Sequence, residues 1–353
     1  MKSVSIVIPN WNGLELLTEH FGSVIAAAEE YRSRANAEVE VIIVDDASTD
    51  RSRDWLLKSY GEHELIKVFE LECNVGFLQA VNEGFTVAKH DVVLLLNNDV
   101  KIEPDCITPL VKHFKDEVVF ATCCRADRID GGRLDGGGKI GRFERGFWRV
   151  FLNYEAIPFE ATTELISFFG SGGYAMYDRN KWNALGGFQD CLSPNYWEDV
   201  EICYRAWKRG WTVVYEPASQ VHHLGSASMK KLDSAEMDIV TERNRLLLTW
   251  INLHDRIWFV QHLGWLGLKL AGSAISLRWN YLRSFGRALS KISKVREARR
   301  IERRAAVISD NALARKFAHL VNQPGIYVVE DEQAEKAFSE MTANAAAASG
   351  TER

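Results

Sequence analysis

The feature that most constrains the fold is an apolar run, Val92–Leu96, which ends directly on Asn97, Asn98 and Asp99. An unbroken run of β-branched and aliphatic residues predicts a strand that is buried on both faces of a parallel sheet. In such sheets, ligands bind beyond the carboxyl ends of the strands. Asp99 is therefore predicted to lie where a cation or a substrate binds.

A second apolar run, residues 41–44, ends in the same way on Asp45 and Asp46. Two buried strands that end on carboxylates indicate a cleft for a polyanion together with a metal ion. Strands and helices are expected to alternate through this part of the chain, which predicts a doubly wound α/β fold. We expect strands over residues 4–9, 39–45, 65–70, 92–96 and 118–123, and helices over residues 13–28, 48–60, 76–88 and 104–114. Ser48 is the expected N-cap of the second helix, and Pro104 fits the first turn of the fourth.

The remainder of the chain has a different pattern. Glycines punctuate residues 131–138, which are predicted to be rich in loops. Further on we expect a strand over 174–177, a helix over 198–209, strands over 212–215 and 218–221, and helices from 230 to 324. We divide the chain into an α/β domain (1–230), a helical and partly basic region (231–333) and a tail (334–353) that we expect to be disordered.

Charge and cysteine content narrow the class of protein. The net charge of −5 hides a basic segment, because residues 278–316 hold twelve Lys or Arg against three Asp or Glu. The six cysteines show no Cys-x-x-Cys spacing, which argues against a zinc site and favours reduced thiols in the cytoplasm. Met1 leads straight into the first strand, so we expect no cleavable signal peptide. No nucleic-acid partner is expected.

Two motifs at strand ends have competing interpretations. Asp45 and Asp46 suit a nucleoside site, in which a carboxylate accepts from a pyrimidine imide or from ribose hydroxyls; the alternative is an N-terminal capping cluster with Ser48. Asn74 and Gly76 precede a helix, and a glycine there lets the backbone approach a phosphate. A turn of this type before a helix is also common without any ligand.

Two later motifs carry acids and imidazoles. Glu198 and Asp199 follow the aromatic Trp197, whose ring would partly desolvate a carboxylate and so suit it to act as a general base. The alternative is that these acids only stabilise a helix N-terminus. His222 and His223 follow a predicted strand, and either imidazole suits a metal ligand.

Taken together, these motifs resemble glycosyltransferase family 2, which has a GT-A fold, over roughly residues 4–228. Within that family the chain is most similar to bacterial rhamnosyltransferase-type members. The resemblance rests on Val-Ser-Ile-Val-Ile-Pro-Asn-Trp-Asn-Gly at 4–13, Asp-Asp-Ala-Ser-Thr-Asp at 45–50, residues 74–82, Asn-Asn-Asp at 97–99, Gly-Ser-Gly-Gly at 170–173, Trp-Glu-Asp-Val-Glu at 197–201, and His-Leu-Gly-Ser-Ala-Ser at 223–228.

The resemblance implies a role for each motif. Asp99 and His223 would bind Mg²⁺ or Mn²⁺, with His223 favoured over His222 because Gly225 then has the family's spacing. Asn97 replaces the first acid of the family's Asp-x-Asp element, so the metal site has less negative charge than usual. The residues implied to bind a dTDP- or UDP-linked sugar are Pro9, Asn10, Asp45, Asp46, Asn74, Gly76, Asn82, Asn97 and Asn98, with Asp46 on the pyrimidine. Gly172, Gly173 and Trp197 would line the cleft where donor and acceptor meet.

The implied reaction inverts the anomeric centre. Asp199, with Glu198 beside it, would take the proton from an acceptor hydroxyl on a saccharide or a lipid-linked saccharide, in the synthesis of a cell-surface polysaccharide. Processive synthases carry a Gln-x-x-Arg-Trp element, and here Arg278-Trp279 lacks the Gln, which favours transfer of one sugar. A nucleotidyltransferase would need a glycine-rich loop after the first strand, where this chain has Asn10-Trp11-Asn12-Gly13. A non-catalytic nucleotide-sugar-binding or scaffold protein is the other alternative, although Asp99 and Asp199 are both retained.

The helical region suggests where the protein acts. Residues 257–271 are strongly apolar but are interrupted by polar residues, which disfavours a membrane span. Residues 282–294 place apolar and basic residues on separate stripes, a pattern that suits a helix on an anionic membrane surface. We therefore expect a peripheral enzyme on the inner face of the cell membrane, docked through residues 257–304. The alternative is a helix packed on the α/β domain or on a second subunit of a homo-oligomer.

Overall fold

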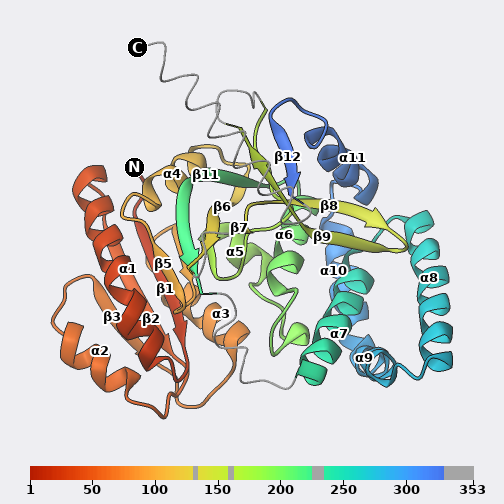
Figure 1. Ribbon diagram of the computed structural model, residues 1–353, viewed down its shortest axis with the longest axis horizontal. Coiled ribbons are helices and arrows are strands. Elements are labelled where there is room, and N and C mark those ends of the chain that lie inside the picture. Colours follow the sequence, from red (N-terminus) through yellow and green to blue (C-terminus); the bar gives the residue numbers. More distant parts are fainter. Residues whose placement is uncertain (130–133, 158–162, 225–233, 330–353) are drawn as a thin grey trace.

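The computed structural model describes residues 1–129, 134–157, 163–224 and 234–329 (Figure 1). Its central sheet has the strand order β3-β2-β1-β4-β10-β6-β11-β5, with β7 paired to β6. The strands are β1 (Val4–Asn10), β2 (Val39–Asp45), β3 (Ile66–Glu70), β4 (Val92–Leu96), β5 (Val100–Ile102), β6 (Val119–Arg128), β7 (Leu134–Gly136), β10 (Tyr174–Asp178) and β11 (Thr212–His223). This mostly parallel sheet confirms the predicted α/β class.

The first half of the sheet is fully parallel and is covered on both faces. β1 pairs in parallel with β2 and with β4, so the carboxyl ends of all three strands lie at one edge. On β1, Ile6 packs in the core shared with α1 (Leu14–Ala35), while Val7 packs against α3 (Phe77–Val87) on the other face. Gly84 lets α3 approach closely, because a Cβ there would lie 2.4 Å from Val7 Cγ1.

The other helices of this domain follow the same division. α2 (Ser52–Tyr60) and α4 (Ile107–Lys112) cover the face of the sheet that α1 covers. α5 (Arg179–Leu185) and α6 (Glu198–Lys208) lie with α3 on the opposite face. Full burial of an aliphatic side chain contributes about 1.5–3 kcal/mol, so the apolar strands hold this edge of the sheet rigidly.

The middle of the chain differs from the expectation of loops. A hairpin of β8 (Gly138–Glu144) and β9 (Phe147–Ala156) forms a second sheet with β12 (Ile326–Val329). The hairpin turns at Arg145 and Gly146, which both have positive φ, the backbone of a tight two-residue turn. The sequence obscured this hairpin because arginine takes a position that asparagine or glycine usually occupies in such turns.

The C-terminal region is helical as predicted, apart from β12. Its described residues form α7 (Ser234–Asn252), α8 (Arg256–Ile275), α9 (Trp279–Leu289), α10 (Ile292–Ala305) and α11 (Asp310–Leu320). Buried Asp310 links three elements, because it accepts from the Lys208 ammonium, from Tyr204 Oη (2.5 Å) and from the backbone N–H of Asp255 (2.6 Å). This network joins α11 to α6 and to the turn before α8. Among the described residues, no helix is long and apolar enough to cross a membrane.

Several predicted element boundaries were wrong. α2 begins at Ser52, and Ser48 instead bonds the side chain of Asp45, so Ser48 is not an N-cap. α4 begins at Ile107, beyond Pro104. Residues 212–221 form one strand, β11, with an irregularity between Glu216 and Gln220. The predicted tail and the boundary at 230 lie outside the described residues.

Candidate active site

The carboxyl ends of β1, β2 and β4 bring the predicted polar residues into one hydrogen-bonded network. Asn10, at the end of β1, donates through Nδ2 to Asp45 Oδ1 (3.1 Å) and accepts at Oδ1 from Asn98 Nδ2 (2.9 Å). Pro9 precedes it on the same buried strand. Gly13 leaves room for this bridge, because a Cβ there would lie 2.2 Å from Asn98 Nδ2. The amide of Asn10 therefore ties the ends of the two neighbouring strands together.

Asp45 and Asp46 accept hydrogen bonds from different segments. Asp45 accepts from the hydroxyl (2.6 Å) and the backbone N–H (3.1 Å) of Ser48, so its carboxylate shapes the turn after β2. Asp46 accepts from the backbone N–H groups of Val75 (2.7 Å) and Gly76 (2.9 Å). Each oxygen of Asp46 accepts one hydrogen bond from the loop before α3. Because a carboxylate oxygen has two lone pairs, each can accept one more.

Asn74 and Asn82, which were both predicted to bind the sugar-nucleotide donor, lie in different surroundings. Asn74 Nδ2 donates to the backbone oxygen of Asp46 (3.3 Å), so Asn74 belongs to the same network. The amide of Asn82 instead bonds the backbone of Phe188: Nδ2 donates to its carbonyl oxygen and Oδ1 accepts from its N–H, at 2.9 Å each. Asn82 therefore joins α3 to the segment before α6.

Beyond β4, Asp99 meets His223. The two side chains approach to 3.5 Å (Asp99 Oδ1 to His223 Nε2), and His223 Nδ1 lies 2.8 Å from Asp135 Oδ2. His222, the next residue along β11, points elsewhere and pairs with Glu103 at 2.7 Å. Although burial opposes it, the carboxylates of Asp135 and Asp99 raise the pKa of His223 to about 9. The imidazole thus lies between two carboxylates, a setting that favours a positive charge.

This corner of the fold has the chemistry of a divalent-cation site. Asp99 Oδ1 and Asn97 Oδ1 are both buried and have no hydrogen-bond partner among the described residues. Across the described ranges, no three His, Cys, Asp or Glu side chains are arranged so that all of them could hold one metal ion. Mg²⁺ commonly takes only one or two protein carboxylates and completes its shell with water and substrate phosphates. Asp99, His223 and the amide oxygen of Asn97 fit that pattern.

Glu198 and Asp199 begin α6 after an unusual turn. Tyr196 and Trp197 have φ of 71° and 69°, values that side chains other than glycine rarely adopt. The turn is held by α7, because Asn244 Nδ2 lies 2.9 Å from the carbonyl oxygen of Tyr196. Backbone strain of this kind persists only when surrounding contacts impose it, and it is common at functional sites.

The loop at residues 170–173 joins these acids to the cation corner. Gly172 N–H donates to Asp199 Oδ2 (3.1 Å), and the carbonyl of Gly173 accepts from Asn97 N–H (2.8 Å). A Cβ on Gly173 would lie 2.7 Å from Asn97 Nδ2, so glycine leaves room for the Asn97 side chain in its present position. Two consecutive residues therefore link Asp199 to the strand end that carries Asp99.

The two acids differ in their surroundings. Asp199 accepts from Gly172 N–H and from its neighbour Val200 N–H (2.7 Å). Glu198 Oε2 is buried and has no hydrogen-bond partner in the part of the chain that the structure describes. Burial, together with the charge of Asp199, raises the pKa of Glu198 to about 8. Burial also raises the pKa of Asp199, but its backbone hydrogen bonds oppose the change. Of the pair, Asp199 is the one suited to carry the negative charge at neutral pH.

Two site residues were missed by the sequence reasoning. Asp135 lies 2.8 Å from His223 on the side away from Asp99, and Lys139 is a partly buried cation whose Nζ donates to Asn153 Oδ1 (2.6 Å). Burial lowers the pKa of Lys139, and the charges of Asp135 and Asp199 oppose that change. Both residues lie in or beside the hairpin that the sequence did not predict. A prediction of that hairpin would have placed them near the site.

Comparisons with known proteins identify a family and several relatives. Residues 5–185 match Glycosyl transferase family 2. An undecaprenyl-phosphate 4-deoxy-4-formamido-L-arabinose transferase of Pectobacterium carotovorum is 33% identical over 132 residues, which are 37% of this chain and 39% of that protein. The chain spans about a third to two fifths of the length of the curated relatives it matches.

Two solved structures share the architecture. The structure of GalNAc-T7 with UDP, GalNAc and Mn²⁺ has a TM-score of 0.54 at 23% identity, over 71% of this chain and 48% of that chain. Residues 1–349 of S. aureus TarS, in complex with UDP-GlcNAc, give a TM-score of 0.51 at 16% identity, over 94% of this chain and 97% of that chain. These likenesses confirm the GT-A fold.

The buried carboxyl of Glu198 allows a test of these pKa shifts. A pKa raised from 4.5 to about 8 means that the native state keeps a proton that the unfolded chain loses. The associated stability is present below pH 4.5 and is lost as the pH rises toward 8. Glu198→Gln has no carboxyl to ionise, so its free energy of unfolding lacks this decrease with pH. Between pH 5 and pH 8 the stability of the variant should therefore rise relative to that of the wild type by an amount on the order of a few kcal/mol.

The measurement is thermal unfolding of both proteins at pH 5 and at pH 8. The difference in melting temperature, variant minus wild type, should increase with pH. The exposed Glu15→Gln is the matched control and should show a constant difference. A constant difference for Glu198→Gln as well would mean that Glu198 ionises normally in the folded protein.

Proposed function

The chain belongs to glycosyl transferase family 2, and we propose that it transfers one sugar from a nucleoside diphosphate donor to an acceptor hydroxyl with inversion of the anomeric centre. The observation that carries this proposal is the pair of contacts from Gly172 to Asp199 and from Gly173 to Asn97. They set a partly desolvated carboxylate beside the strand end where a diphosphate and its cation would bind.

The donor is proposed to be a UDP- or dTDP-linked sugar. Its pyrimidine would contact Asp46, which retains acceptor positions after binding the Val75 and Gly76 N–H groups. Asn10, Asn74 and Asn98 complete that wall. UDP and UDP-GlcNAc in the named neighbours support a pyrimidine nucleotide. We further propose a rhamnosyl donor, on the motif resemblance given above.

Asp99 and His223 are proposed to hold Mg²⁺ or Mn²⁺ together with the donor diphosphate. Such a cation would supply charge stabilisation to the departing nucleoside diphosphate. The buried oxygens Asp99 Oδ1 and Asn97 Oδ1 support this assignment: neither accepts a hydrogen bond from a described residue, and Asp99 Oδ1 has His223 Nε2 at 3.5 Å. Asp135 would orient His223 through its Nδ1, as carboxylates commonly do for metal-binding imidazoles.

Asp199 is proposed as the general base. It would accept the proton of the acceptor hydroxyl while that oxygen bonds to the anomeric carbon and the bond to the diphosphate breaks. The N–H groups of Gly172 and Val200 fix the orientation of the carboxylate without neutralising it. Glu198, which holds its proton at neutral pH, leaves Asp199 without a competing negative charge.

The acceptor is proposed to be a saccharide or a lipid-linked saccharide of a cell-surface polysaccharide, with Gly172, Gly173 and Trp197 lining its path. Peripheral attachment to the inner face of the membrane would suit a lipid-linked acceptor. The division into an α/β domain and a helical region that docks the enzyme is part of the same proposal. A non-catalytic nucleotide-sugar-binding role is the alternative, and release of diphosphate distinguishes the two.

Asp199→Asn should abolish transfer while donor binding is retained. The amide preserves the shape and cannot accept the proton, and loss of a general base typically lowers a rate by about 10²–10⁴-fold. The measurement is nucleoside diphosphate release with acceptor present, alongside calorimetric titration of UDP. Retention of more than about a tenth of the wild-type turnover would exclude Asp199 as the base.

Activity should require a divalent cation, and His223 should matter more than His222. His223→Ala and Asp99→Ala are expected to weaken both Mn²⁺ binding, measured by calorimetry with UDP present, and turnover. His222→Ala is the matched control because that ring pairs with Glu103 away from Asp99. Full activity after exhaustive chelation would contradict the metal assignment, and a larger loss in His222→Ala would reverse the choice of ligand.

A further inference from the structure

The helix α8 has an apolar outer face. Ile257, Val260, Leu263, Leu268 and Ile275 are between 50% and 84% exposed, and together they are called the apolar face below. Lys269 is the only Lys, Arg, Asp or Glu between residues 257 and 277. In Figure 1, α8 lies at the outer edge of the molecule, on the side away from α1 and α2.

The inner side of α8 shows that this exposure is not the result of a loosely packed helix. His262 is fully buried, with Nδ1 2.8 Å from the carbonyl of Gly146 and Nε2 accepting from Trp250 Nε1 (3.0 Å). Trp258 stacks on Phe143 with ring centroids 4.3 Å apart. A helix that buries its histidine and presents leucine and isoleucine outward is arranged for an apolar environment.

A cationic pocket adjoins the apolar face. It has a volume of about 400 Å³, and its basic lining residues are Arg145, Arg149, Arg245 and Lys269. Leu268 lines the pocket and also belongs to the apolar face. The two surfaces are therefore continuous.

The positive charge in this pocket is only partly neutralised. Arg149 pairs with Glu144 at 3.0 Å and Lys269 with Glu242 at 2.9 Å. Within the described part of the chain, Arg145 and Arg245 have no carboxylate within ion-pair distance. Arg245 donates through Nη2 to the carbonyl oxygen of Trp148 (3.3 Å), while its Nε is buried and has no hydrogen-bond partner among the described residues. Unpaired arginines in a partly enclosed site favour an anion, and a phosphate above all, because it matches the guanidinium donors.

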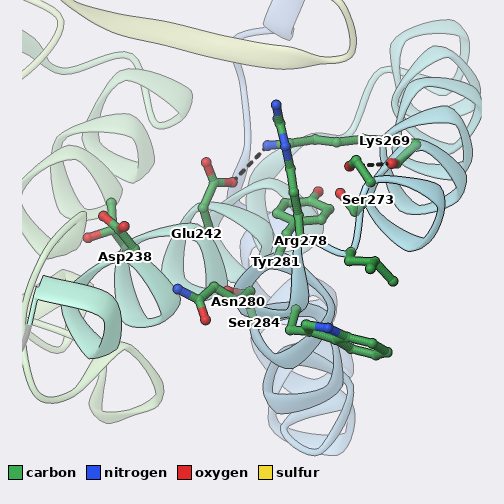
Figure 2. A pocket seen from close by; sticks show the side chains of 13 residues that line it. Asp238, Glu242, Lys269, Ser273, Arg278, Asn280, Tyr281 and Ser284 are labelled. Carbon is green, nitrogen blue, oxygen red and sulfur yellow. Dashed lines mark hydrogen bonds and ion pairs between the residues drawn. The ribbon is translucent and has the colours of Figure 1, made fainter.

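The other hollow beside α8 is lined by two acids, Asp238 and Glu242, and two bases, Lys269 and Arg278. Figure 2 shows Lys269 pointing to Glu242. Lys269 Nζ also lies 4.1 Å from the ring centroid of Tyr281 on that side. Acids and bases balance in that hollow, whereas the cationic pocket has four bases and one acid, Glu144. The excess of positive charge, which favours a phosphate, therefore lies in the cationic pocket.

The cationic pocket is also close to the proposed base. The guanidinium carbon of Arg245 lies 4.6 Å from the ring centroid of Phe147 and 5.7 Å from that of Trp197. Trp197 directly precedes Glu198 and Asp199. Phe151, which is 60% exposed, contacts the same Trp197 ring with centroids 5.0 Å apart. One aromatic residue thus separates the unpaired cation from the acids.

From this juxtaposition we propose that the cationic pocket binds the phosphate or diphosphate of a lipid-linked acceptor, while the apolar face of α8 contacts its hydrocarbon chain. The inference rests on the proposed function and names its acceptor class. The phosphate is held at Arg145, Arg149 and Arg245, so that the sugar attached to it extends past Trp197 toward Asp199. The charge beside the apolar face is the reason for choosing an anionic lipid over a second copy of the chain.

The test is a fluorescence titration of the full chain with farnesyl diphosphate, which combines a diphosphate with an apolar chain. It is run with and without saturating UDP and Mn²⁺, which distinguishes farnesyl diphosphate bound at the donor site from farnesyl diphosphate bound in the cationic pocket. The double variant R145Q/R149Q, and separately R245Q, should weaken farnesyl diphosphate binding about tenfold or more, because each charged hydrogen bond contributes about one such factor. R296Q, at an exposed arginine of α10, is the matched control and should bind like the wild type.

The apolar half of the proposal has its own control. Leu268→Ser should weaken farnesyl diphosphate binding, whereas Leu57→Ser, at an exposed leucine of α2, should not. Inorganic pyrophosphate and farnesol should each bind more weakly than farnesyl diphosphate. Equal binding of pyrophosphate would mean a free-phosphate site, and unchanged binding in both arginine variants would exclude the pocket; either result overturns the proposal.

Two further readouts complete the design. Concentration-dependent dimers that Leu268→Ser dissociates would assign the apolar face to a second copy and overturn the lipid assignment. UDP titration and release of UDP from UDP-sugars are measured on every variant. Normal donor turnover without farnesyl diphosphate binding would refute this inference alone, whereas absent donor binding in the wild type would refute the proposed function.

Discussion

The close approach of the Gly172–Gly173 turn to two other segments is the constraint on which the site depends. One N–H of this turn binds the carboxylate of Asp199, and one carbonyl binds Asn97 at the end of β4. A Cβ at Gly173 would lie 2.7 Å from Asn97 Nδ2, so a larger residue there would displace the side chain of Asn97. Proximity on this scale is what converts separate polar groups into a reactive arrangement.

The C-terminal helices stabilise this arrangement from behind. Asn244 of α7 holds the positive-φ turn at Tyr196 and Trp197, and Asp310 of α11 binds the ammonium of Lys208 on α6. Breaking a buried ion pair of this type by removing one partner typically costs about 3–5 kcal/mol. The helical region is therefore part of the scaffold that positions Asp199, in addition to carrying the exposed surface of α8.

The sequence predicted those features that follow from local pattern. Val92–Leu96 indicated a buried strand, and the parallel sheet then required Asn10, Asp45 and Asn97 to meet at one edge. The pattern left His222 and His223 as alternatives, and the pairing of β11 with β5 turns only His223 toward Asp99. Asn82 was predicted at the donor site because its motif neighbours lie there, but its amide is committed to Phe188.

Other features depend on contacts between segments far apart in the chain, and no local pattern encodes them. Asp135 and Lys139 reach the site through a hairpin whose Arg-Gly turn gives a weak signal. Arg245 lies on α7, about fifty residues beyond the Trp197 ring that it covers. Such contacts are decided by tertiary packing, which overrides local propensity.

The central claim is that Asp199 drives an in-line displacement at the anomeric carbon. The most direct measurement is the anomeric configuration of the product, determined by NMR from the one-bond C–H coupling of the newly linked sugar. A product whose configuration is opposite to that of the donor is the predicted result. A product that keeps the donor configuration would contradict the account, because a single displacement assisted by a base cannot retain it.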